Sequence, residues 1–331
     1  MNKTASKVDK TTMLEILEEN GFKRLTQQDL MNLRFEWLID GFLAKQSLVM
    51  LYAQAGSGKS YFALYLSKFL LENGKIRQVF YLDADNGKPT LKGRQVDKFI
   101  SMPNFEYIAE NKPNKYTIFK HLKRSNDLEN ALIVIDSVRN FIKDDFNKDN
   151  MMIKFFDELQ VLRDRGATII FLHHQPKQIQ DENNKLYKGA TTFLDSVDEG
   201  YFLHKIDIKE YEEFIILVEP QKRRDATKPH AFKINTLKLS FESVDYLKYG
   251  ENHKAQITLN LVKDILSECD ELCQQDLASK IKRKIEQDYI EIVGRNALWK
   301  LLDKYKGILW EITYEPQERG GKKKCFTLIK N

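Results

Sequence analysis

Residues 53–60 read Ala-Gln-Ala-Gly-Ser-Gly-Lys-Ser and lie between two apolar segments. The segment before them, residues 48–52, is a continuous apolar run typical of a buried strand. The segment after them, residues 61–71, has the apolar spacing of a helix. A strand, a glycine-rich turn and a helix in this order let backbone N–H groups surround phosphate oxygens. The stretch is therefore interpreted as a phosphate-binding P-loop, and an ordinary glycine-rich turn is the alternative.

Individual positions of this loop have expected roles. We expect Lys59 to reach the β- and γ-phosphates of a nucleotide and the Ser60 hydroxyl to hold Mg²⁺. Ala53 stands where the usual pattern has Gly, which is a small change beside an intact core at residues 56–60. The predicted nucleotide-binding residues are Ala55, Gly56, Ser57, Gly58, Lys59, Ser60 and Tyr61.

Composition places the chain in a broad class. It has 331 residues, of which 42% are hydrophobic and 31% are charged, as in soluble globular proteins. No apolar run approaches the roughly 20 residues that span a bilayer, and residues 1–7 lack an apolar signal core. We therefore expect a cytoplasmic protein. The net charge of +5 permits nucleic-acid binding without demonstrating it.

The three cysteines, Cys269, Cys273 and Cys325, do not predict a disulfide framework in the cytoplasm. Cys269 and Cys273 could share a metal ion, but no second Cys or His pair lies nearby. Two thiols in a helical core are the favoured interpretation.

Apolar strands alternate with helical segments through the first two thirds of the chain. Strands are predicted at residues 79–84, 131–136 and 167–174, and apolar residues at helical spacing predict a helix before the last of them. This pattern predicts an α/β fold with a mainly parallel sheet covered on both faces. Two further strands, residues 214–218 and 238–241, are expected to extend the sheet in antiparallel fashion.

Three carboxylate or imidazole side chains follow predicted strands, where ligands of open α/β sheets bind. Asp136 ends an apolar strand and is expected to serve the metal ion, with a helix cap as the alternative. Asp85 is expected to orient and deprotonate the attacking water, although Asp-Asn-Gly also favours a tight turn. His174, with Gln175 beside it, is expected to contact the γ-phosphate, unless it only satisfies a local hydrogen bond.

With these residues in order, the chain resembles the RecA-like ATPases, and within them the RepA-type plasmid replicative helicases. The resemblance covers about residues 31–245. The resemblance rests on residues 35–41, the P-loop, residues 81–86, Asp136, residues 173–174 and residues 188–192. In that family the general base is a Glu after the second strand, and Asp85 occupies that place here. Its side chain is one methylene shorter, so either the water is held differently or hydrolysis is slow.

The resemblance also implies cofactors and an assembly. Members use ATP and Mg²⁺ and form rings, usually homo-hexamers, in which a neighbouring subunit completes the site with a basic residue. Arg223 and Arg224 match the position of such residues, with a solvent-facing basic turn as the alternative. The loop at residues 175–192, which includes Lys188, is implied to face the ring centre and touch single-stranded DNA. A solvated loop is the alternative.

The last part of the chain changes character after a polar stretch at residues 249–253. Three helices are expected, including a short one at residues 273–281 and a recognition helix from residue 294, followed by two strands around a basic tip. The arrangement resembles a winged helix, which would bind duplex DNA. Acidic residues at 311–318 leave a protein-binding role as the alternative. The expected DNA contacts are Arg295, Asn296, Lys300 and Lys304 on the helix and Lys322, Lys323 and Lys324 on the wing.

The sequence thus predicts three parts: a helical extension at 1–30, a RecA-like ATPase domain at 31–248 and a winged helix at 255–331. The predicted function is a Mg²⁺- and ATP-dependent, DNA-stimulated ring ATPase. Such an enzyme would be a replicative helicase, or a replication or repair motor, of a plasmid, phage or mobile element. A non-translocating ATP-gated DNA-binding regulator or loader is one alternative. A signalling or defence ATPase with a protein-binding tail is another.

Overall fold

The computed structural model describes residues 12–22, 24–31, 34–109, 117–142, 149–174, 190–208, 212–222, 227–316 and 322–329. The chain divides into two compact units, residues 1–36 and residues 37–331. The first unit contains helices α1 (Met13–Glu19) and α2 (Gln27–Met31). A capping box starts α1, because Thr12 and Glu15 each accept a hydrogen bond from the other's backbone N–H. No described residue of either helix is buried.

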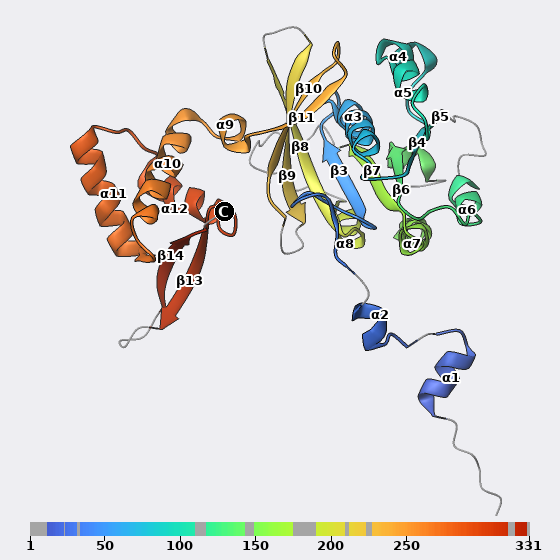
Figure 1. The fold of residues 1–331 in the computed structure, drawn as a ribbon, viewed down its shortest axis with the longest axis horizontal. Coiled ribbons are helices and arrows are strands. Elements are labelled where there is room, and N and C mark those ends of the chain that lie inside the picture. Colours follow the sequence, from blue (N-terminus) through green and yellow to red (C-terminus); the bar gives the residue numbers. More distant parts are fainter. Residues whose placement is uncertain are drawn as a thin grey trace, which may run out of the picture. The chain divides into compact units, whose positions relative to one another are not determined.

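A nine-stranded sheet forms the centre of the second unit (Figure 1). Its spatial order is β11-β10-β9-β8-β3-β7-β6-β4-β5. The six strands from β8 to β5 are parallel neighbours, and β9, β10 and β11 continue the sheet in antiparallel fashion. The strands are β3 (Leu48–Ala53), β4 (Gln78–Asp83), β5 (Phe105–Ala109), β6 (Ala131–Asp136), β7 (Thr168–His174), β8 (Glu199–Asp207), β9 (Glu213–Lys222), β10 (His230–Asn235) and β11 (Ser240–Val244). The predicted α/β fold with a mainly parallel sheet is confirmed.

Helices cover both faces of this sheet, and the alternation of side chains along β3 shows why. Val49 and Leu51 pack into a core with helix α3, whereas Leu48 and Met50 pack into a second core with helix α7. Every residue of β3 is buried, as expected for a strand covered on both sides. The helical elements of this region are α3 (Lys59–Glu72), α4 (Lys88–Gly93), α5 (Val96–Ile100), α6 (Ile118–Leu122), the 3₁₀ helix η2 (Val138–Phe141), α7 (Asp149–Asp164) and α8 (Ala190–Ser196). A small hairpin, β1 (Trp37–Ile39) with β2 (Leu43–Ala44), precedes β3.

Three strands of the sheet were not predicted: β5, β8 and β10. Strand β5 lies at the edge of the sheet, and only its first residue, Phe105, is buried. Strand β8 carries polar residues among its apolar ones, including the buried Glu199. The predicted strand at residues 238–241 begins later, at Ser240, because residues 236–239 form the turn that joins β10 to β11.

The C-terminal part begins with α9 (Tyr246–Gly250), which contacts β9 and β10. Helices α10 (His253–Ser267), α11 (Gln274–Asp288) and α12 (Arg295–Lys304) follow, together with an antiparallel sheet of order β12-β14-β13. Its strands are β12 (Leu272–Cys273), β13 (Trp310–Pro316) and β14 (Lys322–Leu328). Helix α11 has 15 residues and is therefore longer than the short helix predicted. None of the described helices is long and apolar enough to cross a membrane.

The cysteines differ from the helix-core interpretation. All three are free thiols. Cys273 is buried at the end of β12, and Cys269 lies beyond the C-terminus of α10, where its Sγ accepts a hydrogen bond from Lys280 at 2.9 Å. Neither side chain therefore belongs to a helix interior.

Candidate nucleotide-binding site

The glycine-rich loop joins the carboxyl end of β3 to the N-terminus of α3. Gly56 and Gly58 both have φ of +79°, in the left-handed region where side chains other than hydrogen are strained. A Cβ atom at Gly58 would also lie 3.3 Å from the Ile216 side chain on β9. Both glycines are therefore required by the loop's conformation, which directs backbone N–H groups toward a ligand at the helix terminus.

Lys59 is buried, with 5% of its surface exposed, although it carries a charge. Its Nζ atom donates hydrogen bonds to the carbonyl oxygens of Ala53 at 3.1 Å and Gln54 at 2.8 Å. Burial lowers the Lys59 pKa to about 8, and the carboxylates of Asp136 and Asp85 oppose that shift. The ammonium group is thus held at the loop at neutral pH and would gain from an anionic ligand.

This pKa gives a prediction about nucleotide binding. Phosphate oxygens stabilise the protonated amine, so the Lys59 pKa must rise when ATP binds. We expect ATP affinity to fall as the pH increases above about 8, with proton uptake on binding. Titration calorimetry between about pH 7 and 9.5, in buffers of different ionisation enthalpy, measures both quantities. An affinity that stays constant across this range would contradict the assigned role of Lys59.

Asp136 lies at the end of β6, two strands from the P-loop strand, and is buried. Tyr81 donates its hydroxyl to Asp136 Oδ2 at 3.0 Å, and the Ser60 hydroxyl is also hydrogen-bonded to this carboxylate. Burial, with a smaller effect from Asp83, raises the Asp136 pKa to about 6. The structure therefore brings together the two predicted metal-binding residues, which supply the oxygen donors that Mg²⁺ prefers. Because a buried carboxylate needs a counter-charge, this donor set fits a divalent cation.

Asp83, a residue not singled out in the sequence, organises the turn after β4. Its buried carboxylate accepts hydrogen bonds from the backbone N–H of Asp85 at 2.8 Å and of Asn86 at 3.0 Å, and from the Tyr107 hydroxyl at 2.6 Å. The Tyr107 ring stacks on Tyr81 with centroids 4.8 Å apart. The Asp83 carboxylate thus holds the backbone of this turn in place, and the Asp85 side chain remains available to the site.

The Asp85 carboxylate is positioned by side chains from two other elements. Its Oδ1 accepts a hydrogen bond from Asn140 Nδ2 at 3.0 Å, and its Oδ2 lies 3.7 Å from His174 Nε2 at the end of β7. The nearby His174 imidazole, together with the hydrogen bond from Asn140, lowers the Asp85 pKa. The carboxylate is therefore ionised at neutral pH, as a base must be, while its basicity is reduced. Asn140 in η2 was not predicted from the sequence.

Lys59, Asp85 and His174 line a pocket of about 250 Å³ over the P-loop. Besides the predicted residues, it is lined by two further cations, Arg94 and Lys205. The Arg94 guanidinium lies 5.5 Å from the centroid of the Tyr61 ring, and Lys205 Nζ lies 4.8 Å from that of Phe214. A pocket with three cations above a helix N-terminus suits a polyphosphate.

The neighbouring histidines have different environments. His173 is buried and stacks on Phe193 with centroids 4.6 Å apart, and burial lowers its pKa to about 4. His174 faces the pocket instead, as successive residues of a strand must point to opposite sides. Three predicted residues, Lys188, Arg223 and Arg224, lie outside the described residues.

Residues 32–180 match the family model for an AAA domain. The solved structure of a DnaB-like replicative helicase, described with its interactions with primase, aligns with a TM-score of 0.51 at 12% identity. The alignment covers 70% of this chain and 70% of the helicase chain. The chain therefore has a RecA-like α/β fold with a P-loop.

Two other solved structures align with lower TM-scores. The RadB recombinase has 19% identity and a TM-score of 0.44, and the alignment covers 61% of this chain and 93% of the recombinase. A KaiC-like protein from the hyperthermophilic archaeon Pyrococcus horikoshii has 14% identity and a TM-score of 0.45, with 64% of this chain and 100% of its own covered. No curated protein matches the sequence.

The residues expected to contact duplex DNA lie in the C-terminal part, away from the P-loop in sequence. Arg295, Asn296 and Lys300 are exposed on α12. Lys322 is exposed on β14, whereas Lys324 is half-buried, forms an ion pair with Asp303 and lies over the Phe326 ring. Lys304 forms an ion pair with Glu251 at 2.5 Å, so its charge is partly neutralised within the protein.

Proposed function

We propose that this chain is a Mg²⁺- and ATP-dependent, DNA-stimulated ring ATPase, most simply a replicative helicase or replication motor of a plasmid, phage or other mobile element. The observation that carries the proposal is the meeting of Lys59, Asp85, Asp136 and His174 around one loop, at the carboxyl ends of parallel strands. This is where ligands of open α/β sheets bind. The protein would work in the cytoplasm.

The site residues have distinct roles in this proposal. The P-loop N–H groups and Lys59 bind the β- and γ-phosphates, and Ser60 with Asp136 holds the metal ion. Mg²⁺ offsets the negative charge of the phosphate oxygens when it is bound. Asp85 orients the attacking water and accepts its proton, and Asn140 and His174 hold the carboxylate in place.

Assembly would complete this site. Arg94 and Lys205 supply positive charge from the same subunit, and either Arg223 or Arg224 would add an arginine from a neighbour in a ring, most simply a homo-hexamer. Lys188 would contact single-stranded DNA in the ring centre. These assignments rest on the sequence resemblance and on the fold shared with a DnaB-like helicase.

The C-terminal part would act as a winged helix that binds DNA. Its order of elements supports this: three helices, with β12 before α11 and the β13-β14 hairpin last. Helix α12 would enter the major groove with Arg295 and Lys300, and β14 would place Lys322, Lys323 and Lys324 along phosphates.

The wing assignment predicts a change in salt dependence. Replacing Lys322, Lys323 and Lys324 together with Ala is expected to weaken duplex binding and lower the salt slope. Each phosphate contact contributes about one unit to that slope, so the loss should be about two, since Lys324 is already paired with Asp303. Fluorescence anisotropy over a salt series measures it. The matched control removes three exposed lysines of the ATPase domain, Lys75, Lys98 and Lys120, and an equal slope change in both variants would remove the wing from the DNA-binding account.

A non-translocating regulator is the second candidate. The observation in its favour is the lowered pKa of Asp85, which makes this carboxylate a weak base. Strand displacement on a forked duplex separates the two functions. Directional, ATP-dependent unwinding supports the helicase, whereas ATP-dependent DNA binding without unwinding supports the regulator.

A further inference from the structure

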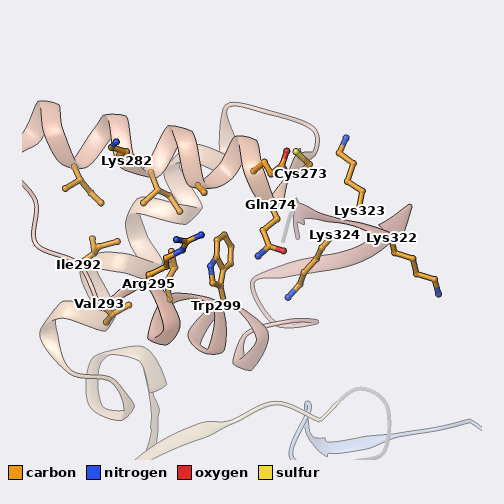
Figure 2. A pocket seen from close by; sticks show the side chains of 15 residues that line it. Cys273, Gln274, Lys282, Ile292, Val293, Arg295, Trp299, Lys322, Lys323 and Lys324 are labelled. Atoms are coloured by element: carbon orange, nitrogen blue, oxygen red, sulfur yellow. The ribbon is translucent and has the colours of Figure 1, made fainter. Parts of the chain in front are cut away.

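A groove in the C-terminal part has a lining unlike that of a surface that only contacts phosphates. It lies between α11, α12 and β14 and has a volume of about 730 Å³ (Figure 2). That volume falls within the range of about 300–1,000 Å³ typical of pockets that enclose a small ligand. It shares no residue with the pocket over the P-loop. The groove is therefore a second candidate site.

The floor of the groove is apolar and includes an aromatic ring. Ile281 and Leu298 are buried beneath it, and Ile285 and Val293 are partly buried at its sides. Trp299 is half-buried on α12, and Figure 2 shows its indole beside Arg295 and Gln274. The outer surface of a duplex offers charged phosphates and sugars, which do not match an apolar floor. The flat face of an unpaired base matches the apolar, aromatic floor, because aromatic side chains stack on bases.

The rim of the groove is positively charged. It carries five cationic side chains, Lys282, Arg295, Lys322, Lys323 and Lys324, and no carboxylate occurs among the described residues that line it. Two of the five also face carboxylates outside the groove: Lys324 pairs with Asp303, and Lys282 lies 3.9 Å from Glu286. The remaining excess of positive charge is complementary to a polyanion.

Two side-chain amides also line the groove. Gln274 and Gln275, the first two residues of α11, both line the groove. A side-chain amide can donate and accept hydrogen bonds together, as the edge of a nucleobase requires. An acidic amphipathic peptide would also suit a basic rim, but it would make no comparable use of an aromatic platform beside two amides.

We propose that this groove binds an unpaired nucleotide, with its base stacked on Trp299 and its flanking phosphates against Arg295 and Lys322. The proposal rests on the proposed function in taking DNA as the ligand. It goes further by giving the C-terminal part a preference for unpaired bases, so that this part recognises a junction between single-stranded and duplex DNA.

The test compares three fluorescein-labelled probes on the full-length chain without nucleotide. They are a thymidine oligonucleotide of about 20 residues, an abasic strand of the same length, and a duplex of the same length. Trp299→Leu is expected to weaken binding of the thymidine strand about 5- to 140-fold, the range expected for losing one stacked base. Binding of the abasic strand and of the duplex should not change. Trp299→Tyr retains an aromatic face and should recover most of the lost affinity.

Three results would overturn the proposal, and the first two concern the Trp299→Leu protein. One is unchanged affinity for the thymidine strand in a Trp299→Leu protein whose melting curve shows that it is folded. The other is an equal loss on all three probes, which would indicate a general effect on the surface. A wild-type protein that binds none of the probes would also exclude the groove as a nucleotide site and favour an acidic peptide. Because these assays need no ATP, they are independent of whether DNA stimulates hydrolysis, which tests the proposed function itself.

Discussion

Replacing Lys59 with Ala is expected to reduce ATP hydrolysis by about 10²- to 10³-fold, the loss typical of removing one preorganised charge-stabilising donor. Lys59 is the loop cation expected to reach the β- and γ-phosphates, and its Nζ atom is already fixed by two carbonyl oxygens of the loop. The neighbouring loop residues cannot take its place, since they supply only backbone groups and hydroxyls. Steady-state release of phosphate at saturating ATP and Mg²⁺ measures the effect.

A second lysine on the same helix provides the control. Lys68 pairs with Glu72 at 2.5 Å and does not line the pocket over the P-loop. Lys68→Ala should hydrolyse ATP at nearly the wild-type rate. If Lys59→Ala did so as well, the P-loop assignment would be wrong.

Asp136→Asn is expected to abolish Mg²⁺-dependent hydrolysis and, at the same time, to make the nucleotide-free protein more stable at neutral pH. The catalytic loss follows from removing a negatively charged ligand of the metal ion. The gain in stability follows from the pKa of Asp136, which burial raises to about 6 in the folded protein. A carboxyl with a raised folded-state pKa contributes stability below its unfolded value of about 3.8, and that contribution is lost as the pH rises through about 6.

The sign of this effect can be checked by thermal unfolding. At about pH 7.5 the variant should melt a few degrees above wild type, because it has no buried charge at this position. The difference should shrink as the pH falls from about 6 toward 4, where the wild-type carboxyl is protonated. Asp97→Asn removes an exposed carboxylate of α5 and should show no such gain. If the variant were less stable than wild type at both about pH 7.5 and about pH 4, the Asp136 charge would not destabilise the nucleotide-free protein, which would contradict the prediction.

The local part of the nucleotide site was predictable from the sequence. A P-loop is a short, contiguous motif, and the strands before Asp136 and His174 are apolar runs that end at the predicted residues. Since the carboxyl ends of parallel strands meet at one edge of the sheet, strand-end residues must gather there.

The rest of the site depends on the order of the strands in the sheet, which could not be predicted from the sequence. Lys205 lies on β8 and lines the pocket because β8 pairs with the P-loop strand β3. The paired residues, Leu51 on β3 and Tyr201 on β8, are far apart in the sequence. Asn140 contributes through its contact with Asp85, and Tyr107 through its contacts with Asp83 and Tyr81. Their surroundings in sequence have no distinctive pattern. The groove beside Trp299 likewise arises from packing between helices and a strand, and the sequence alone indicated only a basic surface there.

The central claim is that this RecA-like domain couples ATP hydrolysis to DNA, and one assay tests it most directly. ATP hydrolysis by the wild-type protein is measured with Mg²⁺, with and without single-stranded DNA, with Lys59→Ala as the blank. The account predicts hydrolysis that requires Mg²⁺ and rises markedly when single-stranded DNA is added. Binding of ATP with little turnover, unaffected by DNA, would contradict it and would mean that the site around Asp85 serves a switch.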